Sequence, residues 1–538
     1  MTAAPSQTIA CQTINAGDWI RLSAQRFGDR DCFIDEGTGT THTFAQTNER
    51  VNRLANALAA AGIGKGDRLV ILANDSHRYM ETLLASMKLG ATYVPLNVRL
   101  AAFEIQNLIT ASGARWLFAS SRYVEMAAQM TTRDQSPLNI IAYESPDTPA
   151  PGPADITMYE PFLATGDTTE PGVNVDDGDI IGLAFTSGTT GLPKGVLQSQ
   201  GMIKNMVMAC LLDYEIGPDE CRYSAAPMFH ISGMAMIMMG VLRGYPNILA
   251  SQFDPAQVLQ WLADDRLTGC FMVPTMLASV LDQPGVDDHD FDRLQSIVYG
   301  AAPMPPSLLR RAMNTFSCNF IQAFGAGTEA GLQAVLTPAD HRRALDGHEY
   351  LLTSIGKPAS NVDLRLCDDD LNDVPAGTVG EIVTRSDMVM SGYLDNPEAS
   401  ADALAGGWFR AGDLAWMDDD GYLYLSGRKK DMIIRGGENV YPIEIETVLF
   451  EHDAIKDAAV VGHPDEHWGE TVAAYLVLEP GAATPPDDEL AAFCRSKLAR
   501  YKVPTDYMWV DTFPLNASGK VLKRELRSPH TPGTSLED

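Results

Sequence analysis

Helix and strand patterns alternate along residues 43–97, and this alternation constrains the fold more than any other feature of the chain. Thr43 and Gln46 have the spacing of a capping box, apolar residues follow at helical intervals, and Gly62 suits the end of a helix. The next segments have the patterns of a turn with a buried strand, a helix and a second strand, at 64–74, 81–91 and 92–97. Such βα alternation predicts a layered α/β domain.

The chain has 538 residues and is too long for a single core, which predicts more than one domain. A charged turn and a glycine turn separate strand patterns near residues 428–437, and one helix pattern and two strand patterns follow, at 442–452, 457–465 and 471–480. We therefore predict a large N-terminal α/β domain over 1–429 and a small α+β domain over 430–538. The Pro-rich segment 142–161 is expected to be a surface loop, and the residues after about 528 a disordered tail.

The formal net charge of −30 argues against nucleic acid or an anionic membrane surface as a partner. An anion that binds this chain must be held by backbone N–H groups and a few well-placed cations. The longest apolar stretch, 231–242, is too short to span a bilayer and is expected to form a buried helix.

The eight cysteines are scattered, without a C-x-x-C pair, which is typical of reduced thiols in a cytoplasmic protein. The N-terminus lacks the basic and apolar regions of a secretory signal.

The stretch TSGTTGLPKGV, residues 186–196, follows the apolar run IIGLAF. Ser, Thr and Gly allow backbone N–H groups and hydroxyls to converge on an anion, and a lysine adds a mobile positive charge. The usual P-loop places a hydroxyl residue after its lysine, whereas Lys194 is followed by Gly195. The stretch therefore predicts a phosphate-binding loop of another kind, and a surface linker is the alternative.

Five motifs in this order resemble the adenylate-forming superfamily, which includes acyl-CoA synthetases, luciferases and the adenylation domains of peptide synthetases. The motifs are TSGTTGLPKG (186–195), PMFH (227–230), YGAAPM (299–304), the segment 408–446 and PLNASGK (514–520). The resemblance extends from about residue 20 to about residue 525. It implies a multi-subdomain adenylation domain of layered sheets with a small β-barrel-like part, and a mobile C-terminal domain. It also implies ATP, Mg²⁺ and CoA as cofactors and co-substrates, and is compatible with a homodimer.

The resemblance assigns roles to individual residues. Asp413 would hydrogen-bond the ribose hydroxyls, Arg428 would contact the ribose or a phosphate, and Lys520 would bridge the carboxylate and the α-phosphate. Lys430 would be the hinge between the two half-reactions. The phosphate loop would comprise Thr186, Ser187, Gly188, Thr189, Thr190, Gly191 and Lys194, the turn against adenine Gly300, Ala301, Ala302 and Pro303, and the CoA tunnel Arg435, Gly436, Gly437 and Glu438.

The stretch QAFGAGTEAG, 322–331, departs from the family pattern of an aromatic residue, Gly, any residue, Thr and Glu. Either one residue is inserted and Phe324 still stacks on adenine beside Gly325, or no aromatic ring stacks there. Glu329 as the Mg²⁺ ligand and Thr328 as a phosphate contact persist in both interpretations. The same stretch matches the G-x-G-x-x-A fingerprint of dinucleotide-binding folds, which is weak evidence by itself.

The acyl pocket implied by the resemblance is apolar, with His230 as a gate for the carboxylate. It would be lined by Met228, His230, Met234, Val273, Met276 and Met304, and ordinary core packing is the alternative for each methionine. The catalytic set would comprise Lys520, Thr186, Glu329 and His230.

These features predict an ATP-dependent acyl-CoA synthetase for an apolar monocarboxylic acid, fatty or alicyclic. An aryl-CoA ligase of the benzoate or cinnamate type and an acyl-AMP ligase that loads a separate carrier protein are the enzymatic alternatives. A non-catalytic binding protein of the same fold is the alternative from another class.

Overall fold

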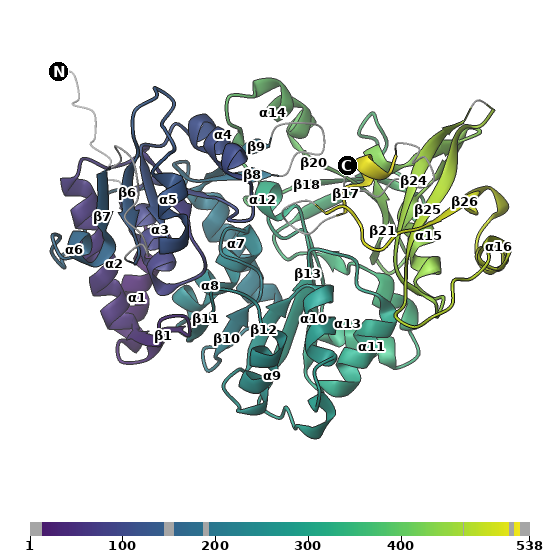
Figure 1. Cartoon of the computed structure of the whole chain (residues 1–538), viewed down its shortest axis with the longest axis horizontal. Helices are drawn as coiled ribbons and strands as arrows, with labels where there is room; N and C mark the ends of the chain where they lie inside the picture. Colours follow the sequence, from purple (N-terminus) through teal and green to yellow (C-terminus); the bar gives the residue numbers. More distant parts are fainter. Residues whose placement is uncertain (1–12, 145–154, 187–192, 466, 516–520, 528–538) are drawn as a thin grey trace, which may run out of the picture.

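The computed structural model describes residues 13–144, 155–186, 193–465, 467–515 and 521–527. Two large sheets and a small antiparallel sheet form the N-terminal part, and a further sheet forms the C-terminal domain at one end of the molecule (Figure 1). The fold is α/β, as the alternation predicts.

The first sheet is parallel through its centre and antiparallel at β8, β9 and β19. Its strands in spatial order are β19 (Gly392–Tyr393), β9 (Lys194–Ser199), β8 (Ile180–Thr186), β4 (Thr92–Pro95), β3 (Arg68–Leu72), β5 (Trp116–Ala119), β6 (Asn139–Ala142) and β7 (Asp155–Met158).

The second sheet is mostly parallel and ends in an antiparallel strand at one edge and an antiparallel pair at the other. Its strands in spatial order are β16 (Lys357–Pro358), β15 (Ala334–Leu336), β14 (Asn319–Phe324), β13 (Ser296–Gly300), β12 (Gly269–Met272), β10 (Arg222–Ser224), β11 (Asn247–Leu249), β1 (Asp31–Asp35) and β2 (Thr40–Thr43).

Helices cover both large sheets because each apolar sheet face must be buried. The central layer between the sheets packs as one core cluster and contains α1 (Asp18–Phe27), α2 (Phe44–Ala60), α3 (His77–Leu89), α7 (Gln200–Asp213) and α8 (Ile231–Arg243). The outer face of the first sheet carries α4 (Ala102–Ser112) and α5 (Ser121–Ala127). The outer face of the second carries α9 (Pro255–Ala263), α10 (Pro274–Leu281), α11 (Pro306–Thr315) and α13 (Pro338–Leu345).

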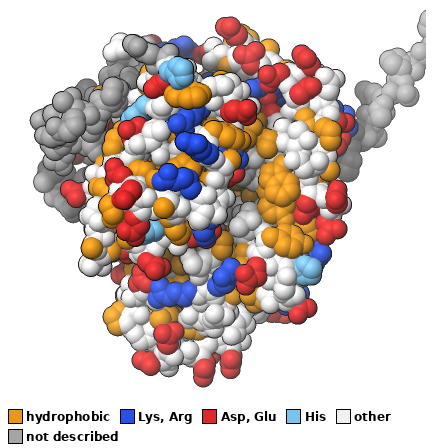
Figure 2. All heavy atoms as spheres, turned by 90° about the vertical axis from the view of Figure 1, so that its right-hand side faces the viewer, with side chains coloured by type: hydrophobic (Ala, Val, Ile, Leu, Met, Phe, Trp, Pro, Cys, Tyr) orange, Lys and Arg blue, Asp and Glu red, His pale blue; other side chains and the backbone are white. Residues whose placement is uncertain are grey.

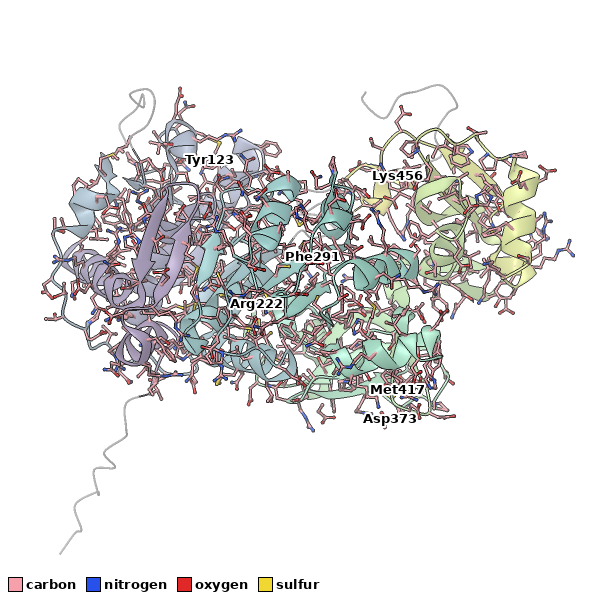
Figure 3. The ribbon with its side chains drawn as sticks, turned by 90° about the horizontal axis from the view of Figure 1, so that it is seen from below. Tyr123, Arg222, Phe291, Asp373, Met417 and Lys456 are labelled. Carbon is pink, nitrogen blue, oxygen red and sulfur yellow. The ribbon has the colours of Figure 1, made fainter. Side chains whose placement is uncertain are left out.

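The small antiparallel sheet connects the large sheets to the C-terminal domain. Its strands are β17 (Asp363–Cys367), β18 (Gly380–Arg385), β20 (Phe409–Met417) and β21 (Leu423–Arg428), and α14 (Pro397–Ala403) precedes β20. Asp373 and Met417 mark this sheet in Figure 3, and Lys456 marks the C-terminal domain.

The C-terminal domain packs helices on a mixed sheet. Its strands are β22 (Ile433–Arg435), β23 (Glu438–Val440), β24 (Ile455–Asp465), β25 (Gly469–Leu478) and β26 (Asp506–Trp509), and its helices are α15 (Pro442–Leu449), α16 (Asp487–Arg495) and α17 (Lys523–Leu526). The helix and strand patterns predicted after residue 430 are confirmed to within three residues at each end.

Local sequence signals set several of these elements. The predicted capping box is present at the start of α2, where Thr43 and Gln46 satisfy each other's backbone N–H groups. Helix α3 begins at His77, four residues earlier than predicted, because the Ser76 hydroxyl accepts the N–H of Tyr79 and caps it. Helix α8 confirms the buried helix expected at 231–242.

The Pro-rich segment 142–161 is not a loop throughout. Residues 155–158 form β7 at the edge of the first sheet, and α6 (Tyr159–Leu163) follows, with Tyr159 buried. Residues 145–154 of this segment and the predicted tail after 528 lie outside the described residues.

Each cysteine within the described residues is a free thiol, as the scattered spacing predicts. In the same part of the chain, no helix has the length and apolar character needed to cross a membrane.

Candidate active site

The predicted phosphate loop connects two antiparallel strands of the first sheet. Thr186 ends β8, Lys194 begins β9, and the two residues pair across the strands. The ammonium of Lys194 lies 4.8 Å from the centre of the Tyr393 ring on β19, within cation–π range. Residues 187–192, which include Ser187, Gly188, Thr189, Thr190 and Gly191, lie outside the described residues.

The unusual stretch 322–331 forms a tight turn after β14. Gln333 donates its backbone N–H to the Phe324 carbonyl at 2.8 Å, which closes the turn. A Cβ on Gly325 would lie 2.1 Å from the Gly331 carbonyl oxygen, so this position requires glycine. The short helix α12 (Gly327–Ala330) occupies the turn and carries Glu329.

The backbone around Glu329 is held in place by β9 and by the segment that precedes β19. The buried side chain of Gln198 on β9 donates to the Thr328 carbonyl at 3.1 Å. The N–H of Met390 donates to the Glu329 carbonyl at 2.7 Å. Two elements far apart in sequence therefore fix the peptide groups that carry this carboxylate.

Tyr393 connects the phosphate-loop lysine with this turn. Burial, and secondarily the negative charge of Glu329, raises the pKa of Tyr393 to about 12. The ring of Tyr393 thus lies within cation–π range of Lys194, and the charge of Glu329 influences its pKa. Neither Tyr393 nor Gln198 is predicted from the sequence, although each lies in a strand next to the phosphate loop.

Phe324 packs on the apolar side of the small antiparallel sheet. Its half-buried ring contacts the cluster built around Ile355, Ile382 and Leu423. Helix α12 has only four residues, so the long helix that a dinucleotide-binding fingerprint must open is missing after β14. Stacking of Phe324 on adenine stays a prediction.

The turn predicted to lie against adenine follows β13. Gly300 pairs with Ala323 on β14, and a Cβ on Gly300 would lie 2.2 Å from the Ala323 carbonyl oxygen. Ala301 adopts a positive φ of 66°, a strained conformation for a residue with a side chain. Ala301, Ala302 and Pro303 are exposed at the carboxyl end of the parallel strands, where ligands of α/β sheets bind.

Asp413 and Arg428 pair across β20 and β21. The Arg428 Nε lies 2.8 Å from the Asp413 Oδ1, and the Asp413 side chain is only 10% exposed. A cavity of about 300 Å³ adjoins the pair, lined by Ala411, Gly412, Arg428, Lys429 and Lys430. The structure therefore places Arg428 and the predicted hinge residue Lys430 around one cavity, and Asp413 pairs with Arg428 across β20 and β21.

Ion pairs surround the predicted hinge. Lys430 lies in a short 3₁₀ turn, and partial desolvation, followed by the charge of Arg428, lowers its pKa although the residue as a whole is exposed. Lys429 contacts Asp369 and Glu381, two carboxylates of the small antiparallel sheet. Arg527, after α17, donates to the Lys430 carbonyl at 3.1 Å and to Asp431.

The glycine turn predicted to border the CoA tunnel joins β22 to β23. Gly436 and Gly437 have positive φ values of 60° and 85°. The N–H of Gly436 donates to the Trp468 carbonyl at 2.7 Å, and a Cβ on Gly436 would lie 2.7 Å from the Trp468 ring. Arg435 donates to the Tyr501 carbonyl at 2.8 Å.

Figure 2 shows the face of the molecule at the C-terminal end, where Lys and Arg side chains gather among scattered acidic ones.

Lys520 lies outside the described residues. The residues that flank its loop are described: Leu515 and Val521 form an antiparallel bridge, and Leu522 donates to the Pro514 carbonyl at 2.8 Å.

The predicted acyl-pocket residues pack in two places. Met228, Met234 and Val273 belong to the core between the large sheets, and His230 is the N-cap residue of α8. Met276 and Met304 pack in the core on the outer face of the second sheet. A single pocket that contains all six residues stays a prediction.

A half-buried carboxyl group positions the beginning of the PMFH segment. Asp75 accepts the N–H of Met228 at 2.9 Å, and burial raises the pKa of Asp75 to about 7 against the lowering effect of that hydrogen bond. Asp75 is not predicted from the sequence, because it lies more than 150 positions before the segment that it contacts.

Comparisons with known proteins define the class to which this fold and site belong. Residues 20–394 match the family described as AMP-binding enzyme, and residues 444–520 match the AMP-binding enzyme C-terminal domain. The chain therefore belongs to the AMP-binding enzyme family. It is an acid–thiol ligase of the AMP-forming type, and adenylate-forming enzymes of this family use ATP and CoA, with Mg²⁺.

The relatives act on different acids. The chain is 36% identical to a feruloyl-CoA synthase of an Amycolatopsis species, over 91% of this chain and 94% of the relative. It is 30% identical to a long-chain-fatty-acid–CoA ligase of Mycobacterium tuberculosis, over 96% and 99%. The structure of o-succinylbenzoate CoA synthetase from Bacillus subtilis, in complex with its acyl-adenylate, aligns with a TM-score of 0.81 at 28% identity, over 97% and 99%.

Proposed function

We propose that this enzyme is an ATP-dependent acyl-CoA synthetase for an apolar monocarboxylic acid. The observation that supports this best is the group formed by Lys194, Tyr393 and Glu329 beside the phosphate loop, together with the Asp413–Arg428 pair. Adenylation of a carboxylic acid requires a cation for the phosphates, a carboxylate for the metal ion and a carboxylate for the ribose. Lys194, Glu329 and Asp413 would supply these groups, in the family's order along the chain.

In the first half-reaction, the substrate carboxylate oxygen attacks the α-phosphorus of ATP and pyrophosphate leaves. We assign Thr186, Lys194 and the loop between them to the β- and γ-phosphates, and Asp413 with Arg428 to the ribose. The exposed turn at 300–303 and Phe324 would flank adenine. Lys520 would bridge the carboxylate and the α-phosphate, where negative charge gathers as the new bond forms.

The residues around Glu329 fit a magnesium ion. Its carboxylate is a hard oxygen ligand, half-buried on a turn that Gln198 and Met390 hold in place. Thr186, which has a hydroxyl group, ends β8, the strand that pairs with β9. When bound, Mg²⁺ would neutralise charge on the phosphates. Thr328, beside Glu329, would contact a phosphate.

In the second half-reaction, the CoA thiolate attacks the acyl carbon and AMP leaves. We propose a division into domains 1–429 and 430–538, with rotation about Lys430 between the half-reactions. That rotation would move Lys520 away and bring the turn Arg435–Glu438 to the entrance of the CoA tunnel. The ion pairs of Lys429 with Asp369 and Glu381 would have to break or move with it.

The apolar lining supports a fatty or alicyclic acid as substrate. Met228, Met234 and Val273 belong to the core between the large sheets. His230 would gate the carboxylate and need not act as a base, because a carboxylate is already ionised at neutral pH. An aryl-CoA ligase is the second candidate, because the relative at 36% identity is a feruloyl-CoA synthase. We further propose a cytoplasmic enzyme of fatty-acid metabolism, with a homodimer as its possible assembly.

The deciding experiment measures AMP and pyrophosphate over fatty, alicyclic and aryl acids, each with and without CoA, and identifies products by mass spectrometry. A CoA thioester from one class supports the synthetase and identifies the substrate. Pyrophosphate release that is independent of CoA would support an acyl-AMP ligase with a carrier partner.

Lys520→Ala separates an enzyme from a nucleotide-binding protein. We expect a loss of about 10²–10³-fold in pyrophosphate release with nucleotide affinity retained, as for other donors to a developing charge. Equal traces of pyrophosphate from the variant and the wild type would contradict the assignment.

A further inference from the structure

Two histidines and a glutamate meet in the interior, on the side of the molecule opposite the C-terminal domain. His42 lies on β2 at the edge of the second sheet, and His77 and Glu81 lie one turn apart on α3. One ligand atom from each residue lies within 4.8 Å of the other two. The spacing of four residues along α3 places His77 and Glu81 on one helix face.

A neighbouring carboxylate fixes the orientation of His77. Asp35 on β1 lies 2.6 Å from the Nδ1 of His77, and both side chains are only 2% exposed. A proton shared at Nδ1 leaves Nε2 with its lone pair available. A carboxylate behind a histidine is the usual arrangement around a protein-bound metal ion, because it fixes the ring and its tautomer.

His42 has a buried ring nitrogen without a hydrogen-bond partner among the described residues. This nitrogen is Nδ1, and the ring centre of His42 lies 4.9 Å from that of His77. A buried polar atom without a partner requires an explanation, and a bound ion is one. The half-buried side of His42 on the edge strand gives such an ion a route from solvent.

Glu81 can accept one more partner. Its oxygens accept hydrogen bonds from Arg50 at 2.7 and 3.0 Å and from Tyr159 at 2.7 Å. A carboxylate offers about four acceptor sites, so one lone pair on Oε1 remains.

The surrounding charges favour a divalent cation. Arg50 and Arg78 bring two positive charges, and the network around them holds four carboxylates, those of Asp35, Glu81, Glu144 and Glu160. With neutral histidines, the network carries two excess negative charges, which a divalent ion would neutralise.

We propose that His42, His77 and Glu81 bind one divalent transition-metal ion of the zinc type, with Asp35 orienting His77. Two neutral imidazoles and one carboxylate are a common ligand set for Zn²⁺, at bond lengths of about 2.0–2.2 Å. To bind one ion at these bond lengths, the ligand atoms need to approach one another by about 1 Å. The ion connects the edge strand β2 to helix α3 and stabilises the folded chain.

The test uses the full-length protein, stripped with a chelator and dialysed against Zn²⁺ alone. Bound zinc is measured for the wild type, for His42→Ala and for His289→Ala, a control at an exposed histidine outside the cluster. We expect the wild type and the control to retain one zinc ion per chain more than His42→Ala does. We also expect zinc to raise the melting temperatures of these two proteins more than that of His42→Ala. Pyrophosphate release without added zinc should be equal in all three proteins.

The absorption spectrum of the Co²⁺-loaded wild type gives a second readout that does not depend on a variant. Absorption bands typical of Co²⁺ bound by nitrogen and oxygen, without a thiolate charge-transfer band, would indicate that the cluster and not the free cysteines binds the metal. Equal zinc in the three proteins, no zinc in the wild type, or a thiolate spectrum would each overturn the proposal, and a bound water would then explain the His42 nitrogen.

Discussion

Replacement of Gly325 by alanine tests whether the turn around Glu329 must close as tightly as the structure has it. The new Cβ would lie 2.1 Å from the Gly331 carbonyl oxygen, against ordinary contact distances of 3.4–4 Å. The opposing atom belongs to the backbone and cannot rotate away. The turn must therefore open by roughly 1 Å or more, and Thr328 and Glu329 lie inside it.

The magnitude follows from that displacement. A misplacement of about 1 Å in a catalytic group costs on the order of 10²-fold in rate, which is about 2.7 kcal/mol of transition-state stabilisation. Overpacking at the turn adds about 1–3 kcal/mol of destabilisation. We therefore expect a large loss of activity in a protein that still folds.

The assay is steady-state pyrophosphate release at saturating acid, with Mg²⁺ and ATP varied, alongside thermal melts. Gly178→Ala is the matched control, because its Cβ would meet no atom within 4 Å and its φ is not positive. We expect the control to match the wild type. Activity of Gly325→Ala within about threefold of the wild type, with an unchanged requirement for Mg²⁺, would refute the argument that this closure positions Glu329.

Three further predictions concern other parts of the site. Asp413→Asn should raise the KM for ATP by about 10–100-fold, since a hydrogen bond to a charged group contributes about 1.5–3 kcal/mol; an unchanged KM would remove Asp413 from the ribose site. Tyr393→Ala should raise that KM by about 3–30-fold and Tyr393→Phe much less, because only the ring attracts Lys194; equal effects would argue against the cation–π contact. The pKa of Asp75 is raised from 3.8 to about 7, so the folded state holds that proton more tightly and the contribution of Asp75 to stability falls as pH rises through that interval. Thermal melts from pH 4 to about 7 should therefore show a flatter profile for Asp75→Asn than for the wild type, and parallel profiles would contradict the burial of the charge.

Motifs whose residues are close together in the sequence could be predicted from it. The capping box at Thr43, the helix at 231–242 and the glycine turn at 436–437 depend on contacts within a few residues, and the structure has each of them. The error at 142–161 has the opposite cause. Residues 155–158 carry a weak strand pattern and become β7 because β6 offers an open sheet edge.

What the sequence determined by itself is the class of fold and the family, because periodicity and the order of local motifs are written along the chain, and the nucleotide-binding roles of those motifs stay predictions. Only the tertiary structure showed that the Tyr393 ring lies against Lys194, that Gln198 holds the Thr328 carbonyl, and that Asp75 holds Met228. These contacts join residues more than 60 positions apart, and they form only where the sheets bring strand ends together. A long-range contact leaves no local pattern in a single sequence, so sheet packing decided which of the candidate residues meet.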